Sequence, residues 1–479
     1  MTAVDFRCDV LVIGSGAGGA PTAALLAEAG LDVIVAEEGP WVDQGSVVPF
    51  SLEQMERQYR SGGVTVALGL PSVAYTEGRC AGGGTEVNSG LYRRPPAEVI
   101  DRWRTKWRID DLEPDDIDVL AREVEAELSV QTLPGPPSAP SERLRLGAER
   151  LGWRHDESPR WMTYPTKDAR AGQRQSMTRT YLPRSTNAGA RILTQCRVDR
   201  LELRGDRVES AAVTFDDGRR ATIGCRAAIV CAGAIQSPAL LQRSGIRRNI
   251  GNTLAVHPTV KLAARFGEEL NVPDDVPVHQ VKEFAPDLSF GGSASHPGLV
   301  ALALLDQWDD FGNSVTAWRE IAVYYAAITS EGRGRVISVP GLRDPIVTYH
   351  LTRRDRALLR AGLSRLALLL LEAGATDVFP SYRGAPRIRS TRDLAKIEQT
   401  FSANKASVMT VHLCSTVPMG EDRDRCGADS HGRIHGFRNL FVNDASLLPD
   451  APGVNPQGSV MAVALRNARH FLAEEWTRV

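Results

Sequence analysis

The residues best suited to chemistry in this chain are a histidine and an asparagine near the C-terminal end. His412 follows a short apolar run in VHLCSTVPMG, and Asn455 stands before Pro456 and a helix predicted over residues 457–475. A neutral imidazole can accept the proton of a hydroxyl group, and an amide can hydrogen-bond the same oxygen and orient it. The two residues meet only if both segments return to one edge of a sheet, and a single histidine is more often structural than catalytic. Both are therefore candidates on sequence alone.

A glycine-rich turn near the N-terminal end has the spacing of a dinucleotide-binding motif. A mostly apolar strand predicted over residues 8–13 leads into Gly14, Gly16 and Gly19, and a helix of small residues follows to residue 29. The first glycine permits a tight turn, the second lets the backbone approach a pyrophosphate, and the third allows close packing of the helix. The helix N-terminus adds unpaired N–H groups that favour an anion.

An acidic residue follows this turn at the position that a dinucleotide site requires. A second predicted strand, residues 32–36, ends at Glu37, 18 residues after Gly19. A carboxylate there can accept hydrogen bonds from both ribose hydroxyls of an adenosine and repels a 2′-phosphate. The order of strand, turn, helix, strand and acid therefore predicts a βαβ unit that binds a dinucleotide. The alternative is a glycine-rich turn and an exposed acid without a ligand.

Two further segments have compositions suited to ligand contact, although each is ambiguous by itself. Residues 78–92, GRCAGGGTEVNSGLY, are rich in glycine and small polar residues, which permit close approach to a bulky planar ligand. An apolar strand predicted over 440–443 ends at Asp444, whose carboxylate and neighbouring N–H groups are able to hold a second part of a ligand. The helix that begins after Pro456 directs its partial positive charge at the preceding loop.

The remaining pattern indicates more than one domain. Strands expected over 191–203, 207–215 and 227–231 belong with the dinucleotide unit. Residues 259–407 mix alternating strands with an amphipathic helix, which is typical of an antiparallel substrate domain. Residues 41–76 are polar and contain glycines, and they predict a long extended loop.

Composition excludes several functions. The 479 residues are 42% hydrophobic and carry a formal net charge of −1, which suits neither nucleic acid nor an anionic membrane and favours a small uncharged substrate. The seven cysteines are scattered, without a CxxC pair or a ligand spacing, so we expect neither disulfides nor a metal site. We find no signal peptide and no apolar stretch near the ~20 residues of a membrane span, so we expect a soluble cytoplasmic protein.

Five segments, in this order, resemble the glucose-methanol-choline (GMC) oxidoreductases from residue 9 to the last helix. They are GSGAGG with Glu37; GRCAGGGTEVNSGLYRRP; CAGAIQSPALLQRSGI followed by IGNTLAVHP; HLCSTVPMG; and NLFVNDASLLPDAPGVNPQGSVMAVALRNA. The resemblance implies an α/β fold with a Rossmann-like FAD-binding domain and a second, substrate-binding domain built on an antiparallel sheet. The expected FAD-binding ranges are 1–135, 188–258 and 408–479, and the expected substrate-binding ranges are 136–187 and 259–407.

The resemblance also implies roles for individual residues. His412 falls on the family's active-site histidine, and Asn455 falls on a second position that is His or Asn among members. The implied FAD contacts are Gly14, Gly16, Ala17, Gly19, Glu37, Gly82, Gly83, Asn88, Gly90, Leu91, Val198, Ala232, Asp444, Ala445 and Gln457. Some members attach FAD through a histidine just before the motif asparagine, where this chain has Val87, so we expect noncovalent FAD. The family's Ile-Gly-Pro is also replaced here, by Ile246 and two arginines.

The expected reaction is the oxidation of a hydroxyl-bearing substrate, an alcohol, sugar or glycoside, to the carbonyl by hydride transfer to the flavin, with His412 as base and Asn455 orienting the hydroxyl. The electron acceptor is oxygen or another acceptor. Residues 259–407 offer no charged cluster that selects a substrate, and oligomeric state is open. The rivals are a hydroxynitrile-lyase-like enzyme on the same FAD scaffold, an NAD-dependent dehydrogenase, and a flavin-carrying interaction protein without turnover.

Overall fold

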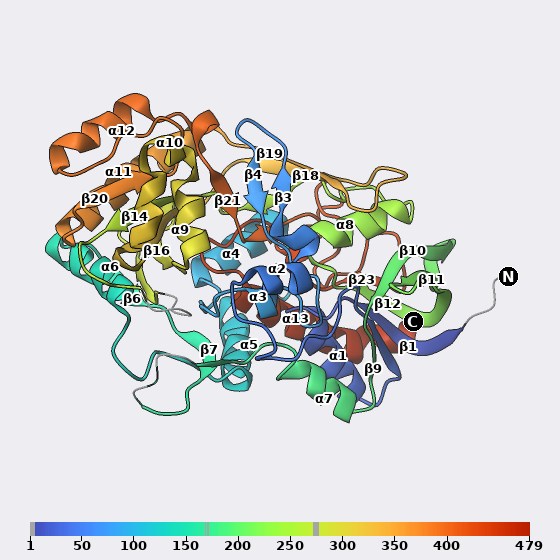
Figure 1. The fold of residues 1–479 in the computed structure, drawn as a ribbon. Coiled ribbons are helices and arrows are strands. Elements are labelled where there is room, and N and C mark those ends of the chain that lie inside the picture. The colour runs from blue at the N-terminus through green and yellow to red at the C-terminus, as the bar shows by residue number, and fades with distance from the viewer. Residues whose placement is uncertain (1–4, 168, 170–171, 272–276) are drawn as a thin grey trace.

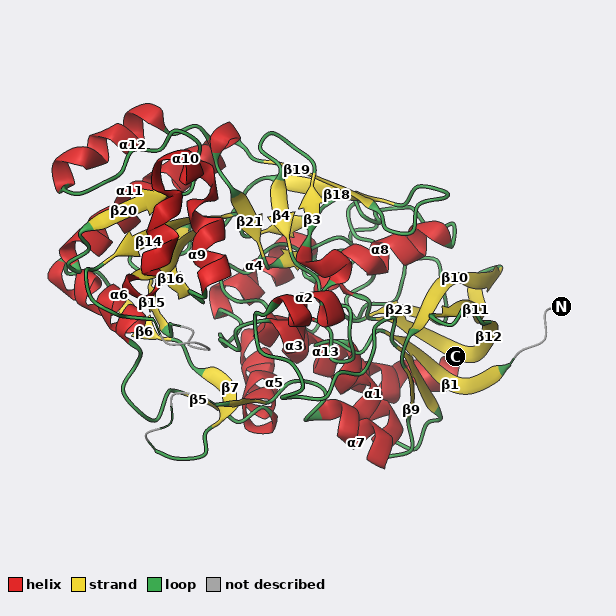
Figure 2. Cartoon of the chain, viewed as in Figure 1, coloured by secondary structure: helices red, strands yellow, loops and turns green. Residues whose placement is uncertain are grey.

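The computed structural model describes residues 5–167, 169, 172–271 and 277–479. Their strands form two main sheets that lie at opposite ends of an elongated molecule, with helices around and between them (Figure 1, Figure 2). A seven-stranded sheet lies at the right of Figure 1 and a nine-stranded sheet at the left. The chain passes between the sheets several times, so each sheet collects segments that are far apart in sequence.

The seven-stranded sheet is built around a buried central strand. β1 (Phe6–Ile13) runs parallel to both β2 (Val33–Ala36) and β12 (Arg220–Val230), and its last four residues are buried. Strands covered on both faces are continuous apolar runs, which explains the sequence DVLVI. The sheet order is β10 (Cys196–Arg204), β11 (Arg207–Phe215), β12, β1, β2 and β9 (Arg191–Leu193), with β23 (Leu440–Val442) beside the end of β12. Helix α1 (Gly19–Glu28) packs against β1.

Parallel strands of this sheet end together at one edge. The Cys231 N–H donates to the Ile13 carbonyl, and the Asn443 N–H donates to the Val230 carbonyl, so the ends of β1, β12 and β23 lie side by side. Helices α8 (Gly233–Arg243) and α13 (Gln457–His470) begin near the same edge. Ligands of open α/β sheets bind at the carboxyl ends of the strands, so this edge is the expected place for a dinucleotide.

The nine-stranded sheet is mostly antiparallel, as the sequence predicts for the substrate side. Its order is β3 (Thr65–Ala67), β4 (Val73–Tyr75), β21 (Val408–Thr410), β14 (Thr259–Arg265), β17 (Ile321–Ile328), β16 (Leu288–Ser293), β15 (His279–Val281) and β6 (His155–Glu157), with β20 (Asp377–Pro380) also paired to β14. Helix α11 (Arg353–Glu372) covers one face, where Val260 and Leu262 join its leucines in one core. Thr259 and Lys261 alternate with them and face a cavity on the other side.

The predicted loop over residues 41–76 is wrong in part. The segment contains α2 (Leu52–Gln58), whose first turn is capped by the Ser51 hydroxyl, and the hairpin of β3 and β4. This hairpin pairs with β21, so three strands from ranges expected in the FAD domain join the other sheet. Each of these strands has only three residues, which is too short for a hydrophobic alternation to identify it, and Val66 in β3 is exposed over 47% of its surface. The domain division itself stays a prediction.

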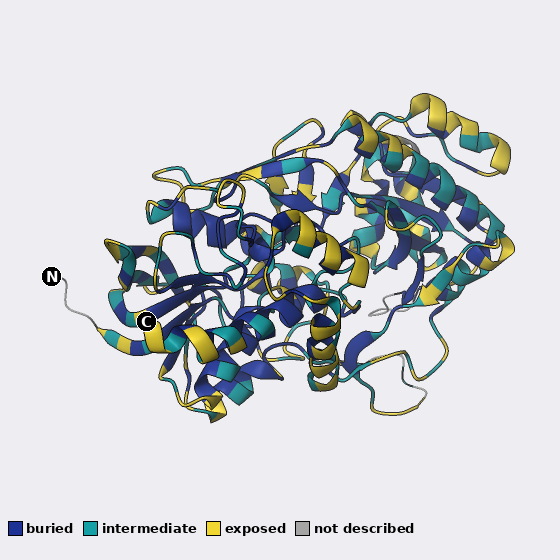
Figure 3. Ribbon diagram, turned by 180° about the vertical axis from the view of Figure 1, so that it is seen from behind, coloured by how far each residue is buried: buried dark blue, intermediate teal, exposed yellow. Residues whose placement is uncertain are grey.

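The other elements complete the layers around the sheets. The further helices are α3 (Gly84–Val87), α4 (Ala97–Trp107), α5 (Pro114–Glu127), α6 (Ala139–Arg150), α7 (Tyr181–Asn187), α9 (Pro297–Leu304), α10 (Trp308–Phe311) and α12 (Leu394–Thr400). The smaller ladders join β13 (Ala255–Val256) to β22 (Leu413–Cys414), β18 (Arg333–Ile337) to β19 (Ile346–His350), and β7 (Arg160–Thr163) to both β5 (Val130–Gln131) and β8 (Gln173–Arg174). Figure 3 shows buried residues concentrated in the sheets and exposed residues on outer helices. Within the described ranges, no helix has the length and apolar content to cross a membrane.

Candidate active site

One cavity collects most of the residues that the sequence singles out. Its volume is about 1310 Å³, and residues of both sheets line it. The predicted site residues in its wall are Gly14, Gly16, Ala17, Glu37, Gly83, Asn88, Gly90, Leu91, Val198, Ala232, His412, Asp444, Ala445, Asn455 and Gln457. Sites for drug-sized ligands measure roughly 300–1,000 Å³, so this cavity has room for a dinucleotide and a substrate together.

Gly19 and Gly82 were expected to contact the cofactor but lie behind the cavity wall. A Cβ on Gly19 would stand 2.0 Å from the Gly14 carbonyl oxygen, so this glycine allows helix α1 to pack against the turn. Gly82 has φ +85° and donates its N–H to the Ser15 hydroxyl. Both glycines therefore shape the wall from behind.

The turn after β1 leaves its backbone open to the cavity. Gly14 adopts φ +101°, which a residue with a side chain rarely adopts, and a Cβ there would lie 2.4 Å from the Cys231 carbonyl oxygen. A Cβ on Gly16 would meet no described protein atom closer than 3.9 Å, because it would project into the cavity. The open side of Gly16 fits the close approach of a pyrophosphate to the backbone.

Glu37 is buried and is already bonded by the chain. Its Oε2 accepts hydrogen bonds from the N–H (3.1 Å) and hydroxyl (2.6 Å) of Ser15, and its Oε1 accepts the Gly39 N–H at 2.8 Å. Burial raises the pKa of this carboxyl group, and the three hydrogen bonds oppose that rise. A carboxylate has about four acceptor positions, so one remains on Oε1 for a ribose hydroxyl.

Asp444 differs from the expectation that its carboxylate binds a ligand. Its Oδ2 accepts from the Gly233 N–H (2.8 Å) and the Ser237 hydroxyl, and its Oδ1 accepts from the N–H (2.8 Å) and hydroxyl of Ser446. Burial raises the pKa of Asp444. With all four acceptor positions used, the side chain fixes the end of β23 against the start of α8, and ligand contact is left to Ala445 and the backbone.

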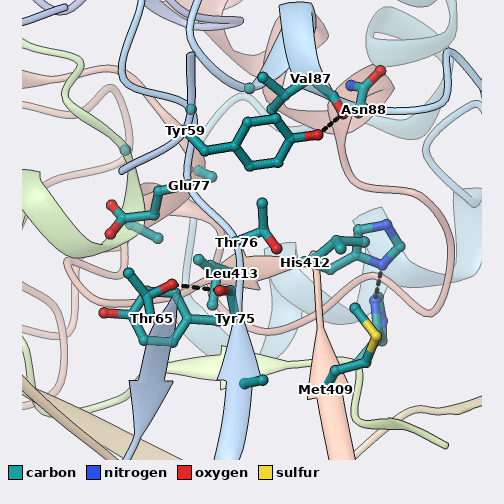
Figure 4. Close-up of a pocket in the computed structure, with 18 of the residues that line it drawn as sticks. Tyr59, Thr65, Tyr75, Thr76, Glu77, Val87, Asn88, Met409, His412 and Leu413 are labelled. Atoms are coloured by element: carbon teal, nitrogen blue, oxygen red, sulfur yellow. Dashed lines mark hydrogen bonds between the residues drawn. The ribbon is translucent and has the colours of Figure 1, made fainter. Parts of the chain in front are cut away.

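His412 is held next to a second histidine by the short β13–β22 ladder. Val256 pairs with Leu413 in this antiparallel ladder, so the next pair places His257 opposite His412. Their Nδ1 atoms lie 3.0 Å apart with the rings at 87°, and Figure 4 draws this contact as a dashed line. The sequence assigned no role to His257, although its His-Pro pair was part of the resemblance.

In the protein without substrate, a backbone bond favours one proton position on each ring. The Gly453 N–H donates to Nε2 of His257 at 3.0 Å, so neutral His257 carries its proton on Nδ1 and donates it to Nδ1 of His412. Neutral His412 then carries its proton on Nε2. Burial, assisted by the charge of Lys282, lowers the pKa of His412 to about 4, so the ring is neutral at pH 7.

A second chain of hydrogen bonds fixes Asn455. Arg93, itself paired with Asp156, donates to Oε1 of Gln280 at 2.9 and 3.1 Å. The amide nitrogen of Gln280 must therefore face away from Arg93, and it donates to Oδ1 of Asn455 at 3.4 Å. This leaves Nδ2 of Asn455 opposite Nε2 of His412, at 3.5 Å. Two N–H groups thus converge on one place in the cavity wall, which is called the catalytic gap below after the role proposed for it.

Two charged residues from the range 259–407 line the cavity, although the sequence of this range shows no charged cluster. Lys261 on β14 and Lys282 after β15 both line the cavity. They stand 21 residues apart on different strands, so no spacing in the sequence could show that they share one face. Gln280 likewise gave no sequence signal, because its role depends on Arg93 and Asn455 from distant segments.

Two family models match this chain in succession. The N-terminal domain model of the GMC oxidoreductases matches residues 55–259, and the C-terminal domain model matches residues 330–464. The chain belongs to the GMC oxidoreductase family. Membership confirms the resemblance seen in the sequence and makes the protein an oxidoreductase, and the family generally binds FAD.

Relatives of this GMC oxidoreductase include both uncharacterized and named enzymes. A GMC-type oxidoreductase of Sinorhizobium fredii is 39% identical over 98% of this chain and 95% of its own length. A long-chain-alcohol oxidase of Arabidopsis thaliana is 26% identical over 96% of this chain and 67% of its own length. The crystal structure of a pyridoxine 4-oxidase, from an organism given as Mesorbium loti, aligns with 97% of this chain and 99% of its own length. The TM-score is 0.73 at 20% sequence identity, which confirms the fold.

Proposed function

We propose that this GMC oxidoreductase binds FAD noncovalently and oxidises a hydroxyl-bearing small molecule, an alcohol, sugar or glycoside, to the carbonyl compound. The observation that carries the proposal is the catalytic gap, where Nε2 of His412 and Nδ2 of Asn455 converge at 3.5 Å in the cavity that also holds the dinucleotide turn. The relatives named as long-chain-alcohol oxidases support a CH–OH donor.

The residues around the cavity fit FAD. The open backbone at Gly16 suits the pyrophosphate, Glu37 retains an acceptor for a ribose hydroxyl, and Val198 lies where the family contacts the adenine. Val87 occupies the position of the histidine that anchors FAD in some members, and a valine forms no such bond. When bound, FAD supplies the hydride acceptor. Acid precipitation should therefore release all of the flavin into the supernatant, and flavin that stays with the pellet would contradict noncovalent binding.

The catalytic gap suits a substrate oxygen. Asn455 donates a hydrogen bond to this oxygen and orients it. The hydrogen on the carbon that bears the hydroxyl group is then held in a fixed orientation. The hydroxyl proton passes to Nε2 of His412 when that nitrogen is bare, so the proton of His412 must then lie on Nδ1 and point at His257. A substrate hydroxyl that donates to Nε2 favours this tautomer. Nδ1 of His257 must then accept, so its own proton moves to Nε2 and the hydrogen bond from the Gly453 N–H is lost. His412 is thus the base, and His257 holds the other end of its ring.

The N-terminus of α13 adds a positive electrostatic contribution to the same cavity. This helix begins at Gln457 directly after Asn455 and Pro456, and these residues line the cavity. Its first N–H groups favour negative charge in their neighbourhood. Gln457 also accepts a hydrogen bond from Asn88 at 2.7 Å, which joins the helix to the glycine-rich segment.

Anaerobic mixing of the purified yellow protein with alcohols, sugars and glycosides tests the proposal. Loss of the oxidised flavin absorbance with one class is expected, and readmission of air then distinguishes oxygen from another electron acceptor. Flavin that no hydroxyl compound reduces would contradict the proposal and favour the lyase alternative, whereas a colourless protein would favour the NAD-dependent alternative. We expect no nucleic-acid or membrane partner, and the cytoplasmic location stays a prediction.

A further inference from the structure

The face of the nine-stranded sheet that lines the cavity carries two lysines. Lys261 on β14 lies opposite Tyr325 on β17, which lies opposite Gly291 on β16, and Gly291 lies opposite Gln280 on β15. Lys282 follows two residues after Gln280 and therefore points to the same side as Gln280. The polar face that these residues form is called the cavity floor below.

Neither lysine has an anionic partner among the residues that the structure describes. Nζ of Lys261 has one hydrogen-bond contact, with the Ser293 hydroxyl at 3.5 Å. In the described ranges, no carboxylate lies within ion-pair distance of Lys261 or Lys282. Asp156, whose charge raises the pKa of Lys282, is already paired with Arg93. The four carboxylates of the cavity wall all have partners of their own. Glu37 and Asp444 accept hydrogen bonds, from Ser15 and Gly39 and from Ser237 and Ser446. Glu38 and Glu77 form ion pairs, with Arg60 and Arg79 and with Arg60.

A positive charge in a partly buried wall costs free energy when no negative group lies beside it, and the ammonium groups of Lys261 and Lys282 are both in this position. Burial lowers the pKa of both Lys261 and Lys282 to about 8, so both are still charged at pH 7. Buried charges in proteins are normally paired or bound to an ion, because desolvation favours the neutral form. A negative group delivered by the substrate would supply the missing partner.

We propose that the cavity floor binds a carboxylate of the substrate, at Lys282 for a short acid and at Lys261, three strands away in the sheet, for a longer one, so that the enzyme acts on hydroxy acids in preference to neutral alcohols. This inference rests on the proposed function and names its substrate class. A carboxylate suits single point charges, whereas the forked guanidinium of Arg93 is already occupied by Asp156 and Gln280. Lys282 lies two residues from Gln280, which bonds Asn455, so an acid group there stands within one small molecule of the catalytic gap.

Matched substrate pairs test the inference. Para-(hydroxymethyl)benzoate and an omega-hydroxyalkanoate are each compared with the corresponding amide by anaerobic flavin reduction. We expect the acid to exceed its amide in kcat/KM, and Lys282→Met to lower this acid-to-amide ratio roughly 10- to 100-fold, the usual worth of a hydrogen bond to a charged group. Lys261→Met is expected to lower it for the longer acid. Exposed Lys106→Met is the matched control and keeps the ratio.

A binding experiment makes the inference independent of turnover and of variant folding. Benzoate, which lacks the hydroxyl, should perturb the flavin spectrum of the unmodified holoenzyme at concentrations where benzamide does not. Two results would overturn the inference: equal kcat/KM values for the acid and its amide, or an acid-to-amide ratio that both lysine variants leave unchanged. The lysines would then contribute only positive charge to the cavity, without binding the acid group. If these compounds and every alcohol, sugar and glycoside all fail to reduce the flavin, the proposed function itself is contradicted, and the benzoate result then decides the anion site alone.

Discussion

The two sides of the cavity differ in how far the protein satisfies its own polar groups. On the dinucleotide side, the buried carboxylates of Glu37 and Asp444 accept three and four hydrogen bonds from the chain. On the side of the nine-stranded sheet, Lys261 and Lys282 have no acid partner in the described part of the chain, and two N–H groups meet at the catalytic gap. The chain therefore fills most acceptor positions of these two buried carboxylates itself, whereas the lysines and the N–H groups of the other side have donors left for a ligand.

This difference indicates what each side contributes. A wall whose polar groups are satisfied is rigid and presents backbone to a cofactor that stays bound. A wall with unmet donors and charges binds a substrate that supplies acceptors, and it loses that stabilisation again when the product leaves.

Gly16→Ala should abolish FAD binding without unfolding the protein. The new Cβ meets no described protein atom within 3.9 Å but projects into the space expected for the pyrophosphate. Gly298→Ala is the matched control, because a Cβ there also meets open space, on α9 away from the dinucleotide turn. The measurement is flavin content per folded protein, with folding followed by circular dichroism. A yellow Gly16→Ala protein would show that this turn does not hold the cofactor.

Asp444→Asn should destabilise the fold. The amide nitrogen would face donors from Gly233, Ser237 or Ser446 in place of an acceptor. Leaving buried donors unsatisfied costs about 1–3 kcal/mol each, so a loss of about 3 kcal/mol in the free energy of unfolding is expected. Urea unfolding of the variant measures it. A loss below about 0.5 kcal/mol would contradict the view that this side is internally satisfied.

The pH dependence of turnover should report the buried state of His412. The base acts when neutral, and its pKa is lowered to about 4, so activity is retained above that value and lost as the pH falls through it. An unperturbed histidine would lose activity near pH ~6.5 and retain roughly a tenth at pH ~5.5. The measurement is kcat/KM for a neutral alcohol between these pH values, with flavin retention as the control. An acid limb centred near pH ~6.5 would contradict the burial of His412 in the working enzyme.

Gln280→Met should give a smaller effect, because it loosens Asn455 without removing it. The substitution deletes the bond that fixes the amide of Asn455 and leaves Arg93 with Asp156. A fall of roughly 10-fold in kcat is expected from one lost hydrogen bond. Gln399→Met, on the exposed face of α12, is the matched control. An unchanged kcat would show that Asn455 needs no support from the cavity floor.

The contrast also explains which parts could be predicted from the sequence. The βαβ unit depends on local patterns, an apolar strand followed by Gly14, Gly16 and Gly19, and these patterns predicted both its fold and its place in the cavity. The residues of the catalytic gap depend on pairings between distant strands. His257 meets His412 through a ladder that joins segments 155 residues apart, and Gln280 is fixed by Arg93 across 187 residues. No periodicity records such contacts.

The same reasoning accounts for the individual errors. Asp444 follows a strand, as a ligand-binding acid does. Its acceptor positions are nevertheless used by Gly233 and Ser237, which are distant in sequence, and by Ser446, two residues later. The strands β3 and β4 are short and partly exposed, so their hydrophobic pattern was too weak to identify them. Only the resemblance to the GMC oxidoreductases brought His412 and Asn455 together before the structure placed them 3.5 Å apart.

The role of His412 as the base is tested most directly by the rate of flavin reduction in His412→Ala, measured by anaerobic stopped flow with the best alcohol substrate. The exposed His350→Ala variant is the matched control. If His412 is the base, His412→Ala reduces the flavin at a rate on the order of 10² to 10⁴ lower with unchanged flavin content, the usual effect of removing a positioned base. A rate within about twofold of the unmodified enzyme would contradict it, because the proton of the hydroxyl would then leave by another route.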